Sequence, residues 1–299
     1  MTVSERILSS PVGEPHVPFV TNGKFQYAYC IIAVHDVKMT RALDEISEIV
    51  RYKEFLRNLV MRDIKVRYKR SVLGFLWVML NPLLMMLILS TVFSEVFKVS
   101  TKNYTTYLIS GIILWNFFSQ STVTSLRSIF GNGNLIKKVY VPKAIFPLSI
   151  ILSAMINFVF SLVPLLIIFF ITGTSVSLNI YLVPVIIILV ALFSFGISLI
   201  LSTLTVFFHD TIYIYDVLLL AWMYATPIFF PESIIPQRFL FILNLNPLYY
   251  FLTTFRAALF MDGSFIFGKL MCSLLFSLAA LAAGLVVYSR YRDRLIYYL

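Results

Sequence analysis

Charged side chains are scarce in this 299-residue chain, at 13% of its residues, whereas apolar side chains make up 60%. A soluble domain has about a quarter charged and about half apolar residues. No Lys or Arg occurs in the 94 residues between Lys143 and Arg238. Because a cation at the centre of a bilayer costs about 2.5–3.5 kcal/mol, this absence indicates membrane-spanning segments and excludes an ordinary soluble domain.

Residue types that carry catalysis or bind metals are also few. The sequence has three histidines and two cysteines, and Cys30 and Cys272 lie too far apart to suggest a metal site or a disulfide framework. The GxxxxGKS/T pattern that holds nucleotide phosphates is missing from the sequence. We therefore expect this chain to have no catalytic residues and to bind no metal or cofactor, and any ATP that drives it to be hydrolysed by another subunit.

Six segments are predicted to be transmembrane helices, each near the roughly 20 residues that a crossing needs. They are residues 71–94, 104–126, 144–172, 180–208, 211–230 and 270–289. Before the last of them, two shorter apolar pieces at 239–243 and 248–260 flank the sequence Asn-Leu-Asn-Pro. Broken backbone at membrane depth survives only where it packs in protein or faces water. We therefore expect re-entrant or gate half-helices there.

Residues 41–70 form a basic segment with apolar residues at three- and four-residue spacing, which predicts an amphipathic helix. Such a helix lies in the membrane interface with its apolar face toward lipid. The sequence thus predicts an all-α membrane protein with three regions. They are a cytoplasmic N-terminal tail at 1–44, an amphipathic interface helix at 45–70 and a six-span transmembrane domain at 71–299.

The distribution of Lys and Arg predicts the orientation. Eight lie within 51–70, four within 127–143 and three within 290–294, all on one side of the predicted topology. The opposite side receives five: Lys98, Lys102, Arg238, Arg256 and Lys269. The side with more cations is cytoplasmic, so both termini are expected in the cytoplasm. Topology and lipid contact, rather than nucleic-acid binding, then account for most of the net charge of +10.

The entry to the first predicted span resembles a known family. The run from Met61 to Trp77, MRDIKVRYKRSVLGFLW, followed by Asn81-Pro82, is similar to the membrane subunit of ABC-type polysaccharide exporters. Similar motifs follow in order at 137–147, at 207–210 (FFHD), at 226–231 (TPIFFP) and at 246–250 (NPLYY), and the resemblance covers about residues 45–299. His209 stands where the family commonly has Arg.

The resemblance implies a homodimeric permease of the bacterial cytoplasmic (inner) membrane, bound to two cytoplasmic ATP-binding subunits that hold ATP and Mg. The cargo would be a lipid-linked polysaccharide of the O-antigen, capsule or teichoic acid type. Two alternatives remain open. One is a related permease for a drug, peptide or other lipid cargo. The other is a membrane enzyme such as a glycosyltransferase, which would need acidic or histidine side chains clustered on one membrane face.

Two groups of basic and polar residues are candidates for function. Cations at the inner headgroup level are suited to bind a pyrophosphate or to anchor the chain on anionic lipid; they are Arg62, Lys65, Arg67, Lys69 and Arg70. The segment at 131–143, between the second and third spans, is expected to couple to the ATP-binding subunit, or else to be a solvated loop. Its coupling candidates are Asn134, Leu135, Ile136, Lys137 and Lys138.

Aromatic residues, 16% of the chain, form a third group of candidates. Their faces suit the C–H surfaces of a sliding glycan, although most aromatic residues in spans serve packing or lie at the membrane interfaces. The channel-lining candidates are Phe75, Trp77, Trp115, Phe117, Phe118, Tyr213, Tyr215, Trp222, Tyr224, Tyr249 and Tyr250.

Overall fold

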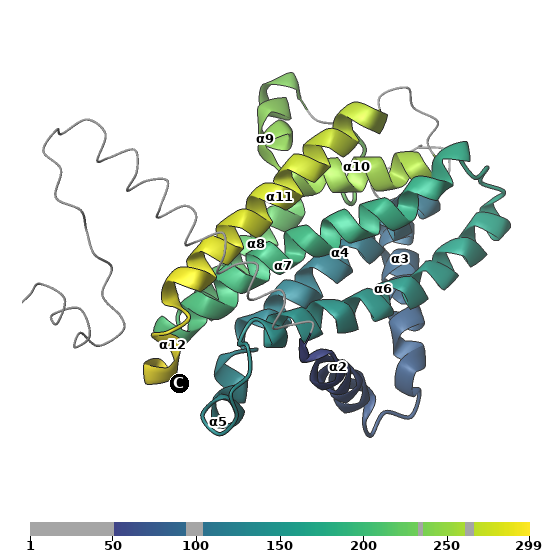
Figure 1. The fold of residues 1–299 in the computed structure, drawn as a ribbon. Coiled ribbons are helices and arrows are strands. Elements are labelled where there is room, and N and C mark those ends of the chain that lie inside the picture. The colour runs from purple at the N-terminus through teal and green to yellow at the C-terminus, as the bar shows by residue number, and fades with distance from the viewer. Residues whose placement is uncertain (1–50, 94–103, 233–235, 261–265) are drawn as a thin grey trace, which may run out of the picture. The chain divides into compact units, whose positions relative to one another are not determined.

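The computed structural model describes residues 51–93, 104–232, 236–260 and 266–299, and every regular element in these ranges is helical (Figure 1). The predicted all-α fold is therefore confirmed for this part of the chain. The tail expected at 1–44 and the first residues of the interface helix expected at 45–70 lie outside the described residues.

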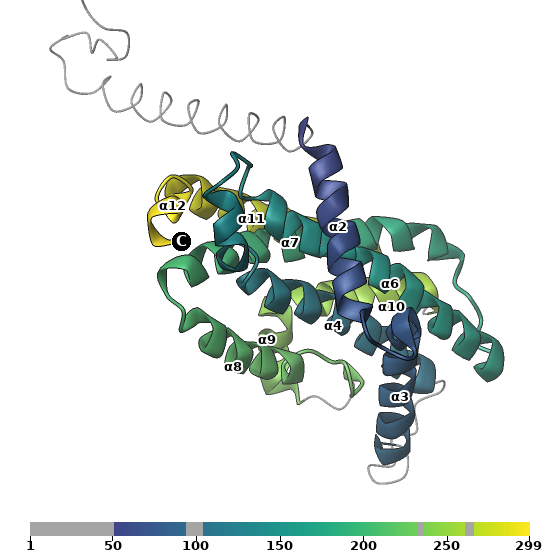
Figure 2. The same cartoon turned by 90° about the horizontal axis from the view of Figure 1, so that it is seen from below.

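The basic amphipathic segment is helical from Lys53 onward, as α2 (Lys53–Tyr68). It crosses the long helix α6 (Ile145–Thr172), against which it packs its buried residues Leu59 and Val60 (Figure 2). The chain then turns sharply, with positive φ at Arg70 and Gly74. A short 3-10 helix, η2 (Gly74–Leu76), leads into α3 (Trp77–Thr91).

Within the described residues, four stretches of helix are long and apolar enough to cross a membrane: Gly74–Thr91, Ile145–Thr172, Leu178–Phe207 and Phe267–Tyr291. They belong to η2 with α3, to α6, to η5 (Leu178–Leu182) with α7 (Val183–Phe207), and to α11 (Ile266–Tyr291). The second predicted span is the helix α4 (Tyr104–Leu126), which is long but carries many buried Ser and Thr residues. The fifth is represented by the shorter α8 (Thr211–Tyr224).

The fifth predicted span ends early because of its own sequence. We expected it to continue to residue 230, but α8 ends at Tyr224. Pro227 has no backbone N–H to donate, and its ring disfavours helical backbone in the residue before it. The prediction was therefore wrong over residues 225–230, which form an irregular connection instead.

The two short apolar pieces are helices, as expected. They are α9 (Leu240–Leu245) and α10 (Pro247–Leu259). Asn246 separates them, and its side-chain oxygen accepts the N–H of Leu248 at 3.0 Å. With Pro247 at the first helical position, this gives α10 a well-formed N-terminus.

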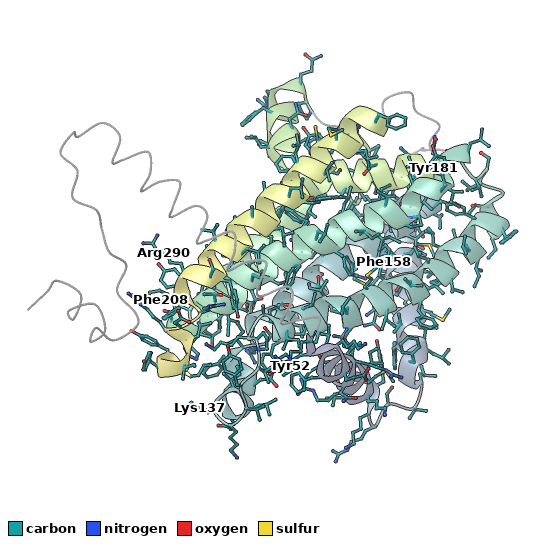
Figure 3. The ribbon with its side chains drawn as sticks, in the orientation of Figure 1. Tyr52, Lys137, Phe158, Tyr181, Phe208 and Arg290 are labelled. Atoms are coloured by element: carbon teal, nitrogen blue, oxygen red, sulfur yellow. The ribbon has the colours of Figure 1, made fainter. Side chains whose placement is uncertain are left out.

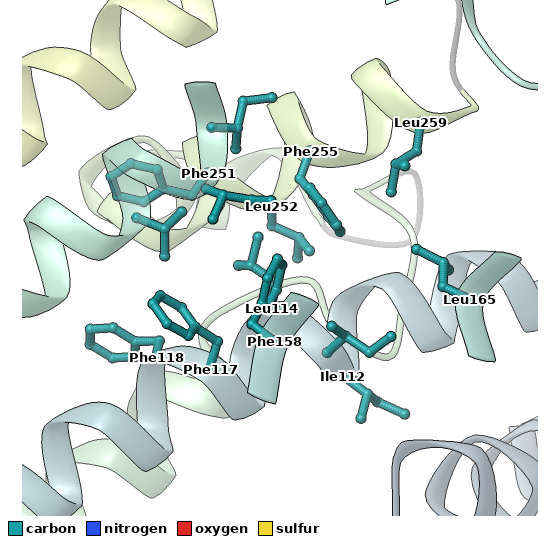
Figure 4. Close-up of a cluster of buried hydrophobic side chains, with 14 of the residues drawn as sticks. Ile112, Leu114, Phe117, Phe118, Phe158, Leu165, Phe251, Leu252, Phe255 and Leu259 are labelled. Carbon is teal, nitrogen blue, oxygen red and sulfur yellow. The ribbon is translucent and has the colours of Figure 1, made fainter. Parts of the chain in front are cut away.

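The main core lies among α4, α6, α7 and α10 and is rich in phenylalanine (Figure 4). Phe117 and Phe118 of α4 meet Phe158 of α6 and Phe251 and Phe255 of α10 in this cluster, and all five are less than 5% exposed. Phe117 and Phe118, named above as channel candidates, thus serve packing within the chain.

The helices α7 and α11 pack against each other at glycine. A Cβ atom at Gly196 would overlap the backbone of Ala280 and Leu281, and one at Gly284 would overlap the backbone of Gly196. Small residues let helix backbones approach this closely in membrane proteins. The Ala280-to-Gly284 spacing of four residues places both small residues on the same face of α11.

A second core joins the ends of several helices. It contains Leu59 of α2, Ile136 of α5 (Gly133–Ile136), Phe146 of α6, Val206 of α7 and Leu295 of α12 (Leu295–Tyr298). The short α5 lies in the connection between α4 and α6. This core therefore fixes α2, the α4–α6 connection and the last helix to one another.

Candidate functional site

A polar cleft of about 690 Å³ lies where α2, α4 and α6 meet. The helix α6 presents Phe146, Ser149, Ile150 and Ser153 to it at the spacing of one helix face. The remaining lining residues come from α2 and from the end of α4 and its connection: Arg62, Asp63, Val66, Arg67, Gln120, Thr124, Arg127, Ser128, Gly131 and Asn132. We call this cavity the polar cleft.

Arg62 and Asp63 are held in place at one end of the polar cleft. Arg62 pairs with Asp63, with 2.9 Å between Nη2 and Oδ1, and its Nη1 donates to Oδ1 of Asn132 at 3.2 Å. The Ser149 hydroxyl donates to the other oxygen of Asp63 at 3.3 Å. These contacts tie the interface helix to α6 and to the α4–α6 connection.

Arg67 has an unmet hydrogen-bonding requirement. Its Nη1 is buried and has no hydrogen-bond partner among the described residues. A buried donor that lacks a partner costs about 1–3 kcal/mol, and more when it is charged. Arg67 also lines a second cavity of about 330 Å³ that shares Gln120 with the polar cleft. An anionic group bound at this junction would supply the missing acceptor.

The second cavity continues the polar lining into the spans. It contains Tyr68, Asn81, Asn116 and Asn157, together with the channel candidate Trp77. The Tyr68 hydroxyl donates to Oδ1 of Asn157 at 3.4 Å, and the amide of Asn157 donates to Gln120 at 3.5 Å. The two cavities together thus present hydroxyl, amide and guanidinium groups.

The five cations predicted to bind a headgroup do not all line the same cavity. Arg62 and Arg67 line the polar cleft, whereas Lys65, Lys69 and Arg70 are exposed on α2 and just after it and line neither cavity. Arg127, at the end of α4, also lines the cleft and was missed by sequence reasoning. Arg127 lies only four residues before the coupling segment at 131–143, and this short distance along the sequence could have indicated that it belongs to the site.

The coupling segment splits between buried and exposed residues. Asn134, Lys137 and Lys138 are exposed, Leu135 is half-buried and Ile136 is buried in the second core. Figure 3 shows Lys137 extending away from the helices. The exposed apolar side chains of the segment are Val139 and Tyr140, and the Tyr140 carbonyl accepts the hydroxyl of Tyr52 at 3.1 Å. Ile136 thus positions the segment rather than presenting itself to a partner.

At the opposite end of α4, a buried arginine supports the irregular connection after α8. Arg256 of α10 is 2% exposed. It donates to the carbonyls of Pro227 at 2.7 Å and Ile228 at 3.0 Å. It also donates to the carbonyl of Tyr107 at 3.0 Å, and its guanidinium lies 3.4 Å from the centre of the Tyr107 ring.

Two tyrosines of α4 complete this support. The Tyr104 hydroxyl donates to the carbonyl of Phe229 at 2.7 Å, and the Tyr107 hydroxyl donates to those of Pro227 and Phe230 at 3.0 and 2.9 Å. Four successive carbonyls outside a helix therefore all have side-chain donors, as a membrane interior requires. We call Arg256, Tyr104, Tyr107 and residues 227–230 the arginine network.

The arginine network corrects one assumption drawn from the sequence. Arg256 was counted among the cations that flank the membrane on one side, but it is buried inside the chain. Gly111 makes room for it, since a Cβ atom there would lie 2.7 Å from its Nη2. The spacing of charges does not reveal this buried role of Arg256, because the carbonyls that it binds lie 28, 29 and 149 residues away along the chain.

The remaining aromatic candidates take different places. Tyr213 and Tyr224 are exposed on α8, Tyr215 is buried and donates to Thr122, and Phe75 and Trp115 are half-buried. Trp222 donates to Asn246 at 2.7 Å, while Tyr249 donates to Glu232 at 3.0 Å and accepts from Lys269 at 3.2 Å. Tyr250, also half-buried, donates to the carbonyl of Asn244 at 3.0 Å.

Comparison with known proteins gives consistent matches. The model of the ABC-2 type transporter family matches residues 54–260. An O-antigen export system permease protein of Klebsiella pneumoniae is 33% identical over 234 residues, which are 78% of this chain and 90% of that protein. One of Myxococcus xanthus is 32% identical over 214 residues, 71% of this chain and 82% of that protein. A capsule polysaccharide export inner-membrane protein of Neisseria meningitidis is 25% identical over 252 residues, 82% of this chain and 94% of that protein.

Proposed function

The chain belongs to the ABC-2 type transporter family, and we propose that it is the permease subunit of an ATP-driven exporter of a lipid-linked polysaccharide. The names of its relatives, which concern O-antigen and capsule export, support this cargo. The single observation that carries the proposal in this chain is the buried Nη1 of Arg67, which has no partner among the described residues and lies at the junction of two polar cavities.

The polar cleft is the proposed receptor for the phosphate groups that join lipid to glycan. It has three guanidinium groups, from Arg62, Arg67 and Arg127, and one carboxylate, Asp63, which already pairs with Arg62. The excess of positive charge therefore lies toward Arg67 and Arg127. Guanidinium groups bind phosphate through paired hydrogen bonds, and these are among the stronger polar contacts in proteins.

The proposed membrane topology has six crossings and both termini in the cytoplasm of the inner membrane. The helices α4 and α8 supply the two crossings beyond the four apolar stretches. The helices α9 and α10 would enter the membrane from the outer face and return to it, with the arginine network saturating the irregular backbone beside them. This places the polar cleft and α5 on the cytoplasmic side.

The proposed assembly is a homodimer with two ATP-binding subunits, each holding ATP and Mg. One outward face of α8 supports dimer formation, since Tyr213, Val217 and Tyr224 are more than 60% exposed and would line the dimer or its channel. The exposed residues Asn134, Lys137, Lys138 and Tyr140 are the proposed contacts to the ATP-binding subunits.

Reconstitution tests the function directly. The chain and its ATP-binding subunit, in proteoliposomes, should hydrolyse ATP faster when a polyprenyl-diphosphate-linked oligosaccharide is added. Arg67→Gln should weaken this stimulation by about tenfold or more, because a charged hydrogen bond contributes about 1.5–3 kcal/mol. The matched control is Lys65→Gln, which removes the same charge from α2 outside the cleft and should leave the stimulation unchanged.

Two results would contradict the exporter function, and a third would contradict only the headgroup site. Robust ATP hydrolysis by the chain alone would make it an enzyme rather than a transport subunit. Stimulation by a drug or a peptide, but not by the lipid-linked oligosaccharide, would favour the alternative cargo. Equal effects of Arg67→Gln and Lys65→Gln would remove the polar cleft as the headgroup site while leaving the exporter function intact.

A further inference from the structure

An apolar groove of about 600 Å³ runs along the other side of α2, where it crosses α6. Its volume falls within the roughly 300–1,000 Å³ that is typical of ligand sites. The helix α6 lines it with a continuous apolar face made of Leu152, Met155, Ile156, Val159 and Phe160. The polar cleft uses a different face of the same helix, so α6 presents Ser149 and Ser153 to one cavity and aliphatic side chains to the other.

The opposite wall of the apolar groove is formed by two stripes of α2. Leu56 and Val60 form the inner stripe, and Lys53, Arg57 and Met61 form the outer one at four-residue spacing. Lys53 and Arg57 are exposed, and Arg57 pairs with Glu54 at 3.9 Å, with both side chains more than 70% exposed. An exposed pair at this distance leaves the cation available to another anion.

We propose that the apolar groove binds an anionic phospholipid of the surrounding bilayer. One acyl chain lies along Met155, Ile156 and Val159 of α6, and the phosphate group binds Lys53 and Arg57. The groove is apolar at its base and has the cations Lys53 and Arg57 at its rim. An anionic phospholipid has the same order of groups, with apolar acyl chains that end at a charged phosphate. The bound lipid adds contacts between α2 and α6 on the side of α2 that does not line the polar cleft.

A lipid with no net charge fits this site less well. Phosphatidylcholine carries its own ammonium group, which opposes the two cations at the rim. A basic residue near an anionic membrane surface contributes about 1 kcal/mol. The proposal does not depend on the identity of the exported cargo, because binding is measured without glycan and without ATP.

The test uses the full-length chain in detergent with phosphatidylglycerol or phosphatidylcholine, and counts retained lipid by native mass spectrometry. The wild type should retain phosphatidylglycerol in preference. Lys53→Glu with Arg57→Glu should weaken retention about 30-fold, equivalent to about 1 kcal/mol for each cation. The matched control is Lys65→Glu with Lys69→Glu, which makes the same charge change on α2 and at the residue that follows it, away from the groove, and should retain the lipid.

A second pair of variants tests the acyl chain without changing charge. Ile156→Trp fills the groove and should abolish retention, whereas Ile167→Trp, on the exposed surface of α6 outside the groove, should not. Equal retention of both phospholipids, or equal losses in each variant and its control, would overturn the proposal. Displacement of phosphatidylglycerol by an equal concentration of a polyprenyl phosphate would assign the groove to the lipid carrier instead.

Discussion

Arg256 is the residue on which the backbone between α8 and α9 depends most. It meets the carbonyl of Ile228, which has no other side-chain donor among the described contacts. It shares the carbonyl of Tyr107 with the Ser110 hydroxyl and that of Pro227 with the Tyr107 hydroxyl. Arg256 has no direct ion pair among the described residues, and a buried arginine in that position is costly unless oxygen acceptors surround it. Here neutral acceptors and an aromatic ring take the place of a counter-ion.

Arg256→Leu is expected to destabilise the chain by about 1–3 kcal/mol, since the buried carbonyl of Ile228 loses its only side-chain donor among the described contacts. Arg256→Lys should lie between this variant and wild type, because an ammonium cannot match the planar fork of donors. The apparent melting temperature of the purified chain in detergent measures the effect. Arg290→Leu, at an exposed arginine of α11, serves as the control. A melting temperature for Arg256→Leu equal to that control would show that the network does not support the connection.

At the scale of elements, the crossing of α7 and α11 depends on glycine. Gly196 and Gly284 lie where the two backbones meet, and neither position has space for a methyl group. Direct backbone contact of this kind is possible only for the smallest side chains. The crossing also carries the hydrogen bond from the Ser277 hydroxyl to the carbonyl of Leu189, at 2.8 Å.

Gly196→Ala is expected to destabilise the chain by about 1–3 kcal/mol through overpacking, because the backbone at Ala280 cannot move aside as a flexible side chain would. Gly131→Ala is the matched control, since a Cβ atom there meets nothing within 4 Å. Thermal unfolding in detergent compares the melting temperatures of the two variants, and that of Gly196→Ala should be the lower. Similar melting temperatures for both variants would mean that the helices separate more easily than their geometry indicates.

For the whole molecule, α5 links the transmembrane helices to the proposed ATP-binding subunit. Its position is fixed from within by Ile136, by contact between Gly133 and Leu299, and by the Tyr288 hydroxyl, which accepts the N–H of Ala144 at 3.1 Å. Lys137 and Lys138 remain exposed beyond it. The segment is therefore rigidly supported on one side and open on the other.

Lys137→Glu with Lys138→Glu is expected to weaken binding of the ATP-binding subunit by about tenfold, since exposed ion pairs contribute up to about 1 kcal/mol each. Insertion of the chain into the membrane should not change. Binding in nanodiscs, measured with titrated ATP-binding subunit, checks this result. Arg290→Glu with Arg294→Glu makes the same charge change at exposed positions in the last turn of α11 and just after it. Unchanged binding in the Lys137 and Lys138 variant would remove this segment from the partner interface.

The sequence by itself determined the helical class and the position of most elements, because apolar length and the signals at Asn246-Pro247 are local. It also predicted the basic amphipathic helix before the first span, whose described part begins at Lys53. Pro227 is a local signal for the end of α8 at Tyr224. The sequence could not predict that Arg256 holds the irregular continuation, because this depends on donors from α4 and α10.

Only the tertiary structure decided which charged and aromatic residues face a cavity and which face the core. Periodicity placed Arg62, Lys65 and Arg67 on one helix, but the crossing of α2 over α6 selected Arg62 and Arg67 for the polar cleft. The same crossing created the apolar groove beside Lys53 and Arg57. A cavity forms between elements, and its lining depends on contacts between residues about 90 positions apart, which local sequence patterns do not specify.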